Sequence, residues 1–536
     1  MGLVNVVEGE RLRHIATWLL LGVSGASVMG AAAREALPSD PALSPLIESA
    51  ERRARSAQPD AGRAVGLHHV DCWFDIPTDW PETRCYQMVV PMDHQNPASR
   101  PIQFPIVRFT PKQPQKGTYP VLHLGGGGPG FPVYMDAQGI ADGSLWWNYQ
   151  RMSLRTGRDL YVMDPRGVGM AEPRLSCIEY LRLTPNYLAK PLRGRVGLEA
   201  GLKPMAECKA RLEREGIALD QFHSRAVARD VEALRLALGI SKWHLYGVSY
   251  ASRYAQSIAR HFPDGVASMA LDSIVFPQIR YAEKAGRDTL DAFRRAFKTC
   301  DETARCRRTF PDLSVRFQSV VRDLDTNPLL MTITHPKDFT RMRIALTGER
   351  LVVLLFYAIY DEEMVEQLPE IVASLEARNT DLVAASVREW VRYLLDEQFA
   401  DAVQTSHFCR EEFPFLNFAN ARANAAGLPR VFANYAQLYL AGLEAQCGIW
   451  AIAPAPETES QPVGTDIPIL VLHGLLDPVL PASDLQAQMV HFTAHATEYF
   501  ADIAHDVVSS SACAERMVGA FFDHGLGYRA FVRCNE

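Results

Sequence analysis

Hydrophobic residues recur along this chain with two different periods, and the change between them divides the chain into regions. Between about residues 119 and 272, short apolar runs alternate with segments whose apolar positions recur every three or four residues. This strand–helix alternation is typical of a parallel sheet covered by helices. The strands expected in this region are 119–124, 158–164, 243–248 and 267–271.

The regions on either side complete the architecture. Residues 86–91 and 102–109 alternate like the two strands of a hairpin. From about Pro277 to Gln461, amphipathic helices follow one another with little strand signal, which predicts a helical insertion over the sheet. The sheet resumes at 467–474 and 496–500. We therefore expect an α/β fold, with a mostly parallel sheet flanked by helices and a large helical cap.

One strand ends in a turn that carries a serine, Gly247-Val248-Ser249-Tyr250-Ala251, and a helix follows directly. Strand, tight turn and helix together predict the nucleophile elbow of an α/β-hydrolase. The turn is so tight that the residues two before and two after the serine must be small. The Tyr250 amide would lie at a helix N-terminus, where it can donate to an oxyanion.

Four glycines, Gly125 to Gly128, directly follow a predicted apolar strand. Glycine lets a backbone approach a ligand closely and direct its amides at it. A flexible linker is one alternative, although linkers do not usually follow a buried strand. A phosphate loop is another, but the required lysine motif is absent from this stretch. We expect the loop to supply the second half of an oxyanion hole.

Hydrolases of this fold order their triad as serine, acid and histidine. Here that order gives Ser249, Asp477 and His505, with both later residues just past predicted strand ends. Taken singly, Asp477 is a good turn residue before a proline and His505 could be a surface residue. His473 is the competing histidine nearest to Asp477 in the chain, and it is expected to pack within its strand.

Five motifs in this order carry a resemblance to a known family: Gly-Gly-Gly-Gly-Pro-Gly at 125–130, Asp-Pro-Arg-Gly-Val-Gly at 164–169, Gly-Val-Ser-Tyr-Ala at 247–251, His-Gly-Leu-Leu-Asp-Pro at 473–478 and Ala-His at 504–505. They resemble the proline iminopeptidase and tripeptidyl aminopeptidase family, and the long cap and cysteines resemble its secreted branch. The resemblance implies a serine exopeptidase on the α/β-hydrolase fold. It implies a peptide substrate with a free N-terminus and no metal or organic cofactor.

The resemblance also assigns residues to the site. It implies Gly127 or Gly128 as the loop donor beside the Tyr250 amide, although Gly126 stands where the family has a histidine. In the cap, Glu411 and Glu412 resemble the family's cysteine–acid stretch. An aminopeptidase needs a carboxylate for the substrate ammonium, and we expect one of these glutamates to provide it. The alternatives are a solvated surface or pairing with Arg410.

Length and charge limit the other possibilities. A chain of 536 residues is too long for one core. The net charge of −7 gives no basic footprint for nucleic acid or an anionic membrane. We expect a signal peptide at 1–33, a loose leader at 34–66, a core in two parts at 67–277 and 462–536, and a cap at 278–461.

The N-terminus predicts export to the periplasm or the outside of the cell, because a basic flank, a short apolar run and small residues follow one another at 11–33. An oxidising compartment suits the ten cysteines. Spacing does not fix their connectivity. We expect neighbours to pair, because each pair then brackets one loop or closes one element: Cys72–Cys85, Cys177–Cys208, Cys300–Cys306, Cys409–Cys447 and Cys513–Cys534.

Two other functions remain open at this point. A secreted carboxylesterase or lipase would share the triad and the oxyanion hole, and would differ only in the cap. An inactive α/β-hydrolase could act as a binding module, although the intact Ser249, Asp477 and His505 argue against it. The sequence leaves open the preferred residue, the number of residues released and the oligomeric state. No membrane insertion of the mature chain is expected.

Overall fold

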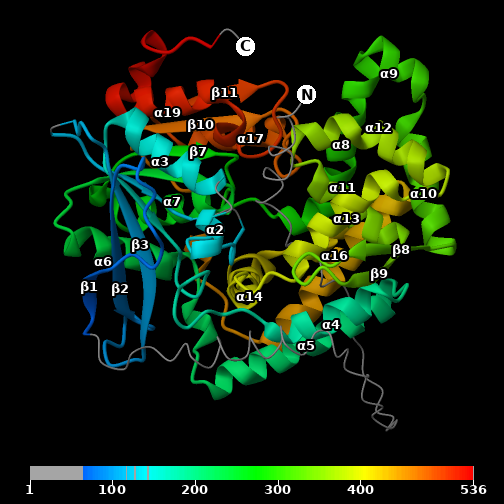
Figure 1. Ribbon diagram of the computed structural model, residues 1–536, viewed down its shortest axis with the longest axis horizontal. Helices are drawn as coiled ribbons and strands as arrows, with labels where there is room; N and C mark the ends of the chain where they lie inside the picture. The colour runs from blue at the N-terminus through cyan, green and yellow to red at the C-terminus, as the bar shows by residue number, and fades with distance from the viewer. Residues whose placement is uncertain (1–63, 116, 126–127, 142–143, 535–536) are drawn as a thin grey trace.

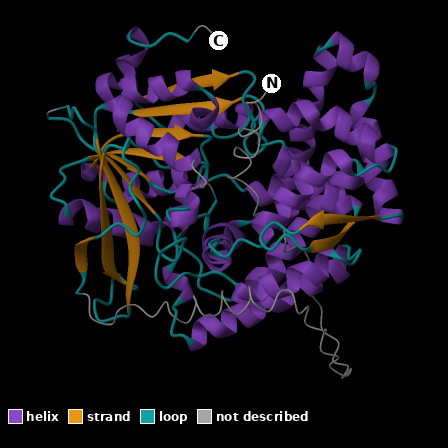
Figure 2. Ribbon diagram, viewed as in Figure 1, coloured by secondary structure: helices purple, strands orange, loops and turns teal. Residues whose placement is uncertain are grey.

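The computed structural model describes residues 64–115, 117–125, 128–141 and 144–534. One large sheet with its flanking helices occupies one side of the molecule, and many further helices gather on the other side (Figures 1 and 2). The expected signal peptide and all but the last residues of the expected leader lie outside the described residues. The strands of the large sheet are β1 (Gly66–Val70), β2 (Glu82–Pro91), β3 (Pro101–Thr110), β4 (Val121–His123), β5 (Leu160–Met163), β6 (Trp243–Val248), β7 (Val266–Asp272), β10 (Ile469–Gly474) and β11 (His495–Phe500).

The order of the sheet is β1-β2-β3-β5-β4-β6-β7-β10-β11. The first three strands pair antiparallel, and β3 also pairs antiparallel with β5. All pairs from β5 to β11 are parallel. This confirms the predicted mostly parallel sheet and the hairpin before it. Parallel strands end at the same edge, so the loops after β4, β6, β10 and β11 share one edge of the sheet.

Alternate residues of the central strands face two separate hydrophobic clusters, as the pleat of a strand requires. Ile469 and Val471 of β10 pack in the cluster that includes α6 and α7. Leu470 and Leu472 pack in the cluster that includes α3 and α19. Both faces of the sheet are therefore covered by helices. The helices of the core are α2 (Ala137–Ala141), α3 (Ser144–Thr156), α6 (Ser224–Ala237), α7 (Tyr250–His261), α17 (Ala482–Gln488), α18 (Val507–Ser510) and α19 (Ala512–His524).

A third hydrophobic cluster belongs to the insertion between β7 and β10. The helices of this insertion lie at the centre and on the right of Figure 1. They are α8 (Tyr281–Glu302), α9 (Ala304–Thr309), α10 (Leu313–Thr326), α11 (Gly348–Ala358), α12 (Glu362–Glu376), α13 (Asp381–Leu394), α14 (Asp401–His407), α15 (Phe418–Ala425) and α16 (Arg430–Trp450). The insertion also holds an antiparallel hairpin, β8 (Leu329–Thr334) with β9 (Arg341–Leu346). The cap is therefore not purely helical.

The cysteine-bounded segment after β5 joins the cap. It forms α4 (Ile178–Leu188) and α5 (Gly194–Arg214), and Figure 1 shows α5 running beneath α16. Leu188 of α4 is buried in the hydrophobic cluster of the cap. All five expected disulfides are present, with the pairing predicted from neighbouring positions. Among the described residues, none of the helices has both the length and the apolar character needed to cross a membrane.

Candidate active site

Ser249 lies between β6 and α7 with φ 54° and ψ −126°, a conformation that L-residues rarely adopt. A Cβ atom on Gly247 would lie 2.8 Å from the carbonyl oxygen of Ala251, so this turn has room only for glycine there. Ala251 itself is fully buried. The Ser249 amide donates to the Asp272 carbonyl oxygen at 2.9 Å, which ties the turn to the end of β7. The serine side chain is thereby presented at the carboxyl edge of the sheet.

Asp477 and His505 meet at the same edge. The Asp477 Oδ2 and His505 Nδ1 atoms are 2.9 Å apart, and both side chains are almost fully buried. The other carboxylate oxygen, Oδ1, accepts the Val479 amide at 2.7 Å. Because Nδ1 faces the carboxylate, Nε2 remains for a proton transfer. Ser249 and His505 both line one pocket. The structure therefore places the three residues at one site.

Each member of this pair changes the proton affinity of the other. Burial alone would raise the pKa of Asp477, but the adjacent imidazole lowers it below its usual range. Burial alone would lower the pKa of His505, but the Asp477 carboxylate raises it above 6.5. An ionised aspartate beside a histidine of raised pKa is the pairing that a general base requires.

The cap contacts this pair directly. Tyr360, which follows α11, accepts the His505 amide on its carbonyl oxygen at 3.2 Å, and its ring meets the imidazole edge to face at 4.9 Å. Arg295 of α8 donates to the Asp477 carbonyl oxygen at 2.6 Å. The cap thus fixes the loops that hold the acid and the histidine.

The pocket at Ser249 is small, with a volume of about 90 Å³, and most of its wall is aromatic or aliphatic. Cap residues form much of this wall. Its aromatic members are Phe131, Tyr281, Phe356, Tyr360, Tyr435 and Tyr439. Gln404 of α14 and Thr289 of α8 add polar groups. A pocket of this size accepts one small group beside the serine.

Asp288 is the single carboxylate among the described residues that line this pocket. Its side chain is 13% exposed, and its Oδ1 atom lies 3.7 Å from Lys284 Nζ. Lys284 is also paired with Asp484. Burial raises the pKa of Asp288 to about 7, because this shared lysine compensates it only in part. Sequence reasoning missed Asp288, because nothing in the apolar pattern of the predicted cap distinguishes it from other helix carboxylates.

The glycine loop follows β4, as predicted. Gly128 has φ 78° and lines the pocket with Ser249. Gly127 lies outside the described residues. Tyr250 is the first residue of α7, so its amide lies at the helix N-terminus beside Ser249. These placements agree with the expected positions of the oxyanion donors, whose role stays a prediction.

Glu411 and Glu412 lie elsewhere than expected. Both are buried against α7, where Arg253 Nε lies 3.4 Å from Glu411 and the guanidinium also bonds Glu412. Glu411 further accepts bonds from the Ser224 amide and hydroxyl at 2.6 and 2.7 Å and from the Tyr250 hydroxyl at 3.2 Å. Neither glutamate lines the Ser249 pocket.

These contacts correct the expectation that one of the two glutamates binds the substrate ammonium. Burial alone would raise the pKa of Glu411, but Arg253 and nearby histidines bring it down to about 2. Its oxygens are already satisfied by the protein's own donors. The pair with Arg410 is not formed either, because Arg410 donates to the Ala453 carbonyl oxygen. Ser224, the first residue of α6, donates both its amide and its hydroxyl to Glu411. The N-cap of α6 is His223, whose side chain accepts the Ala226 amide.

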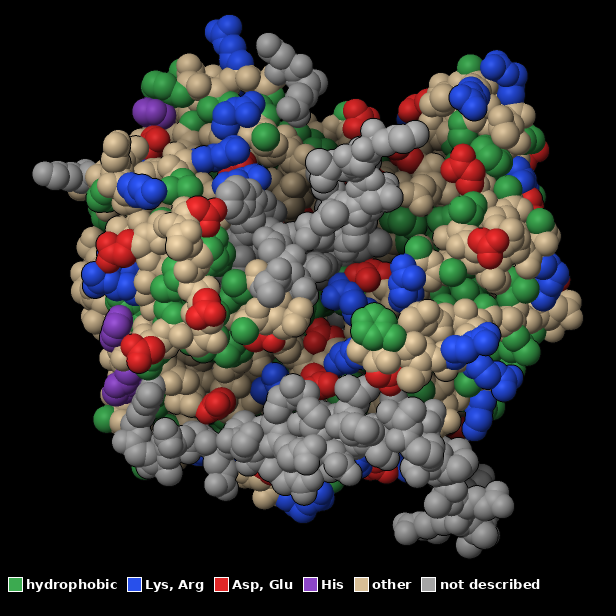
Figure 3. Space-filling model, in the orientation of Figure 1, with side chains coloured by type: hydrophobic (Ala, Val, Ile, Leu, Met, Phe, Trp, Pro, Cys, Tyr) green, Lys and Arg blue, Asp and Glu red, His purple; other side chains and the backbone are tan. Residues whose placement is uncertain are grey.

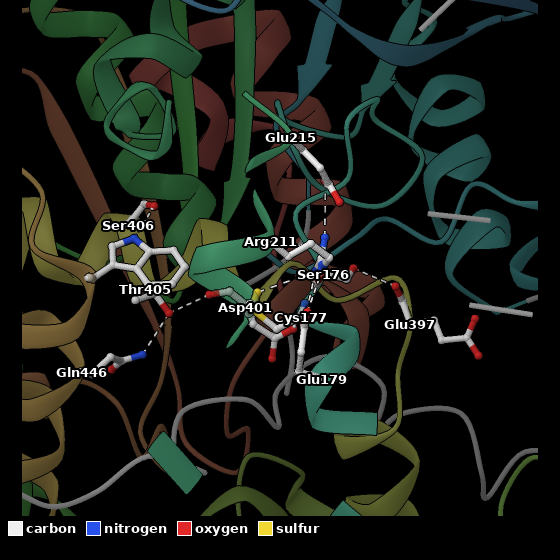
Figure 4. The surroundings of a disulfide bond; sticks show 12 residues. Ser176, Cys177, Glu179, Arg211, Glu215, Glu397, Asp401, Thr405, Ser406 and Gln446 are labelled. Atoms are coloured by element: carbon white, nitrogen blue, oxygen red, sulfur yellow. Dashed lines mark hydrogen bonds and ion pairs between the residues drawn. A yellow bond between two sulfur atoms is a disulfide. The ribbon is translucent and has the colours of Figure 1, made fainter. Parts of the chain in front are cut away.

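The Cys177–Cys208 disulfide lies beside the start of α14, the helix that carries Gln404 (Figure 4). The Cys177 amide donates to Asp401 Oδ2 at 2.9 Å. One helical turn later the Thr405 hydroxyl donates to the Asp401 carbonyl oxygen and accepts from Gln446 of α16. The segment after β5 thus holds a wall of the pocket in place.

Two other groups of residues that could carry chemistry have structural roles instead. Among the described residues, the one group with metal-ligating spacing is Cys177, Glu179 and Cys208, and its cysteines form a disulfide. His473 is buried in β10 with its ring edge on to Tyr499, as expected for a packed histidine. Figure 3 shows acidic and basic side chains interspersed over the face in view, in keeping with the net charge of −7.

Parts of this chain are similar in sequence to known proteins. A tripeptidyl aminopeptidase of Streptomyces coelicolor is 30% identical over 233 residues, 42% of either chain. Serine protease Hip1 of Mycobacterium tuberculosis is 27% identical over 271 residues, 47% of this chain and 48% of its own. The matched segment therefore spans less than half the length of these relatives.

Solved structures resemble the chain more distantly. A proline iminopeptidase of Mycobacterium smegmatis is 14% identical, with a TM-score of 0.33 over 82% of this chain and 97% of its own. The model of the alpha/beta hydrolase fold family matches residues 121–510, which is more than half of the chain. With the sheet order and the serine turn described above, this shows that the chain belongs to the α/β-hydrolase fold family.

Proposed function

We propose that this protein is an exported serine aminopeptidase, which hydrolyses peptide bonds near free N-termini through an acyl-enzyme. The peptidase names of the two curated relatives support a peptide substrate. Five disulfides suit an oxidising compartment and support export.

In the proposed reaction, Ser249 Oγ attacks the scissile carbonyl carbon while His505 Nε2 takes the hydroxyl proton. Asp477 holds the imidazole orientation and stabilises the imidazolium. The Tyr250 amide and a glycine-loop amide, from Gly127 or Gly128, donate to the oxyanion. The amine then leaves with the proton from His505. Water, activated by the same histidine, hydrolyses the acyl-enzyme and regenerates the serine.

The observation that favours an aminopeptidase is the position of Asp288 in the Ser249 pocket. A free ammonium needs a carboxylate at a fixed distance from the scissile carbonyl, and such a pair is strongest where water is partly excluded. Asp288 is largely buried, and its one ion-pair partner among the described residues is Lys284, which it shares with Asp484. A substrate ammonium would supply the missing positive charge. A plain ester would leave this carboxylate uncompensated.

The test compares Asp288→Asn with the unsubstituted protein on matched substrates. We expect KM for a free-amine aminoacyl substrate to rise about tenfold or more, a loss of about 1.4 kcal/mol in binding. Hydrolysis of a simple acetate ester should change little, because the triad is untouched. Asp291→Asn is the matched control, since Asp291 lies three residues further along α8, pairs with Arg294 and is 38% exposed.

Three outcomes would overturn parts of this proposal. Equal losses on both substrates would make Asp288 a structural residue. A preference of the unsubstituted protein for N-blocked or plain ester substrates would make it a carboxylesterase. A failure of a fluorophosphonate probe to label the unsubstituted protein would indicate an inactive binding module. If Ser249 is the nucleophile, Ser249→Ala, Asp477→Asn and His505→Ala should each reduce turnover by several orders of magnitude.

A further inference from the structure

A second and larger cavity, of about 770 Å³, opens in the cap next to the Ser249 pocket. Its walls come from α4, α5, α10, α11, α13 and α16, and Figure 1 shows α10, α11 and α13 on the side of the molecule away from the large sheet. Tyr435 and Tyr439 of α16 line both cavities. Their rings stack with centroids 6.3 Å apart, so this aromatic pair separates the two spaces.

The charges of this cavity are unequal. Its described lining includes four arginines and two carboxylates. The arginines are Arg193, Arg322, Arg350 and Arg430, and the carboxylates are Asp325 and Glu349. The lining therefore has two more cations than anions. The reaction proposed at Ser249 does not use this excess of positive charge.

The two carboxylates are already engaged. Glu349 accepts the Gly194 amide on both oxygens, at 2.8 and 3.1 Å, at the start of α5. Asp325 accepts the Glu349 amide at 3.2 Å at the start of α11. Burial raises the pKa of both, and Arg193 counteracts that effect in each. Arg430 also acts on Asp325 and Arg350 on Glu349, so the two acids hold helix N-termini and compensate the four arginines only in part.

The arginines differ in their roles. Arg350 is buried and donates to the carbonyl oxygens of Leu188, Ala345 and Tyr187, which leaves its charge without a bonded carboxylate. Within the described part of the chain, the exposed side chains of Arg193, Arg322 and Arg430 form neither a hydrogen bond nor an ion pair with another side chain. Three guanidinium groups therefore remain able to bind an anion that enters from solvent.

We propose that this cavity binds the carboxylate-bearing part of a peptide substrate. The pocket at Ser249 has room for one small group, so the remainder of a peptide must lie outside it. The adjoining cavity offers aromatic walls for the peptide and guanidinium groups for a carboxylate, which arginine binds with bidentate geometry. The carboxylate is either the peptide C-terminus or an acidic side chain. The proposal rests on the proposed function only in taking a peptide as the ligand.

The experiment uses four pentapeptides that share their first four residues and end in Glu or Gln, each as the free acid or the C-terminal amide. We expect kcat/KM to be higher for the peptides that carry the recognised carboxylate than for the Gln amide, which has none. Arg322→Gln/Arg430→Gln should lower it by roughly fivefold or more for the peptides that carry the recognised carboxylate and leave the Gln amide, which has no carboxylate, unchanged. The preference should also weaken at high salt, because these arginines are exposed. Arg195→Gln is the control, since Arg195 of α5 pairs with Glu199 and does not line the cavity.

The four peptides distinguish the two possible sources of the carboxylate. A loss confined to the free acids identifies the C-terminus, and a loss confined to the Glu peptides identifies the side chain. Equal losses for all four peptides, or no loss for any, would overturn the proposal. Calorimetric binding of the same peptides to Ser249→Ala keeps this test independent of cleavage. A protein that binds the carboxylate-bearing peptides through these arginines but hydrolyses no peptide would refute the proposed function alone.

Discussion

The carboxylate of Asp272 accepts the amide hydrogen of Val507, joining the end of β7 to the segment directly after His505. The Val507 and Val508 amides lie 2.9 and 2.8 Å from the two Asp272 oxygens. The neighbouring Ser273 hydroxyl accepts the Asp506 amide at 3.0 Å. The histidine is therefore held from two sides, by Asp477 at its ring and by Asp272 through the backbone that follows it.

Asp272→Asn should lower kcat by about tenfold, because an amide oxygen replaces only one of two carboxylate acceptors. Burial raises the pKa of Asp272 to about 7, so this side chain gains or loses its charge near pH 7, within the pH range of the assay. The acid limb of the kcat–pH profile should therefore shift in Asp272→Asn, while KM stays close to its original value. An unchanged profile together with a loss of folded protein would assign Asp272 a purely structural role.

Activity should fall on acidification, with a midpoint above pH 6.5. His505 must be neutral to accept the Ser249 proton, and Asp477 raises its pKa above that value. The measurement is the pH dependence of kcat/KM on an N-blocked ester, which makes no use of Asp288. On a free-amine substrate, Asp288 adds a second loss near pH 7, since it must be ionised. Asp288→Asn should remove that second component and leave the first.

Arg253→Met should destabilise the fold by about 3–5 kcal/mol, because it leaves Glu411 and Glu412 buried without their cation. Urea unfolding followed by circular dichroism measures this loss. Arg195→Met is the control, since the Arg195–Glu199 pair is more than half exposed and worth about 0–1 kcal/mol. Similar losses in the two variants would show that the buried cluster contributes no more than a surface pair.

Removal of Cys409–Cys447 should cost more stability than removal of Cys300–Cys306. The first closes a loop of 38 residues and the second a loop of 6. In the chain-entropy description these losses are about 4 and about 2 kcal/mol. Paired alanine variants, compared by urea unfolding, check the order. A larger loss for the shorter loop would mean that local packing at the cysteines outweighs the loop entropy.

The features predicted from the sequence are those set by short stretches of chain. The strand before Ser249, the small residues around it and the helix from Tyr250 to His261 all depend on neighbours within a few positions. The predicted strand ends, together with the order of serine, acid and histidine in hydrolases of this fold, then indicated Ser249, Asp477 and His505. The disulfides followed for the same reason, because each closes a nearby loop.

The features that sequence reasoning missed depend on contacts between distant segments. Arg253 and Glu412 are 159 residues apart, so nothing near the glutamate indicated its partner. Asp288 differs from other helix carboxylates only because α8 turns it toward Ser249. The hairpin of β8 and β9 was missed within a run of helices, although alternate residues of β8 are buried, as in any two-faced strand.

The insertion between β7 and β10 separates Ser249 from Asp477 and His505 along the chain. Ser249 precedes the cap, while Asp477 and His505 follow it, and Tyr360 of the cap contacts the histidine. A ribosome that has released the serine must still synthesise more than two hundred residues before the base emerges. If Ser249 acts with His505 as proposed, a chain still on the ribosome that already carries the serine therefore stays inactive until the whole cap has been made.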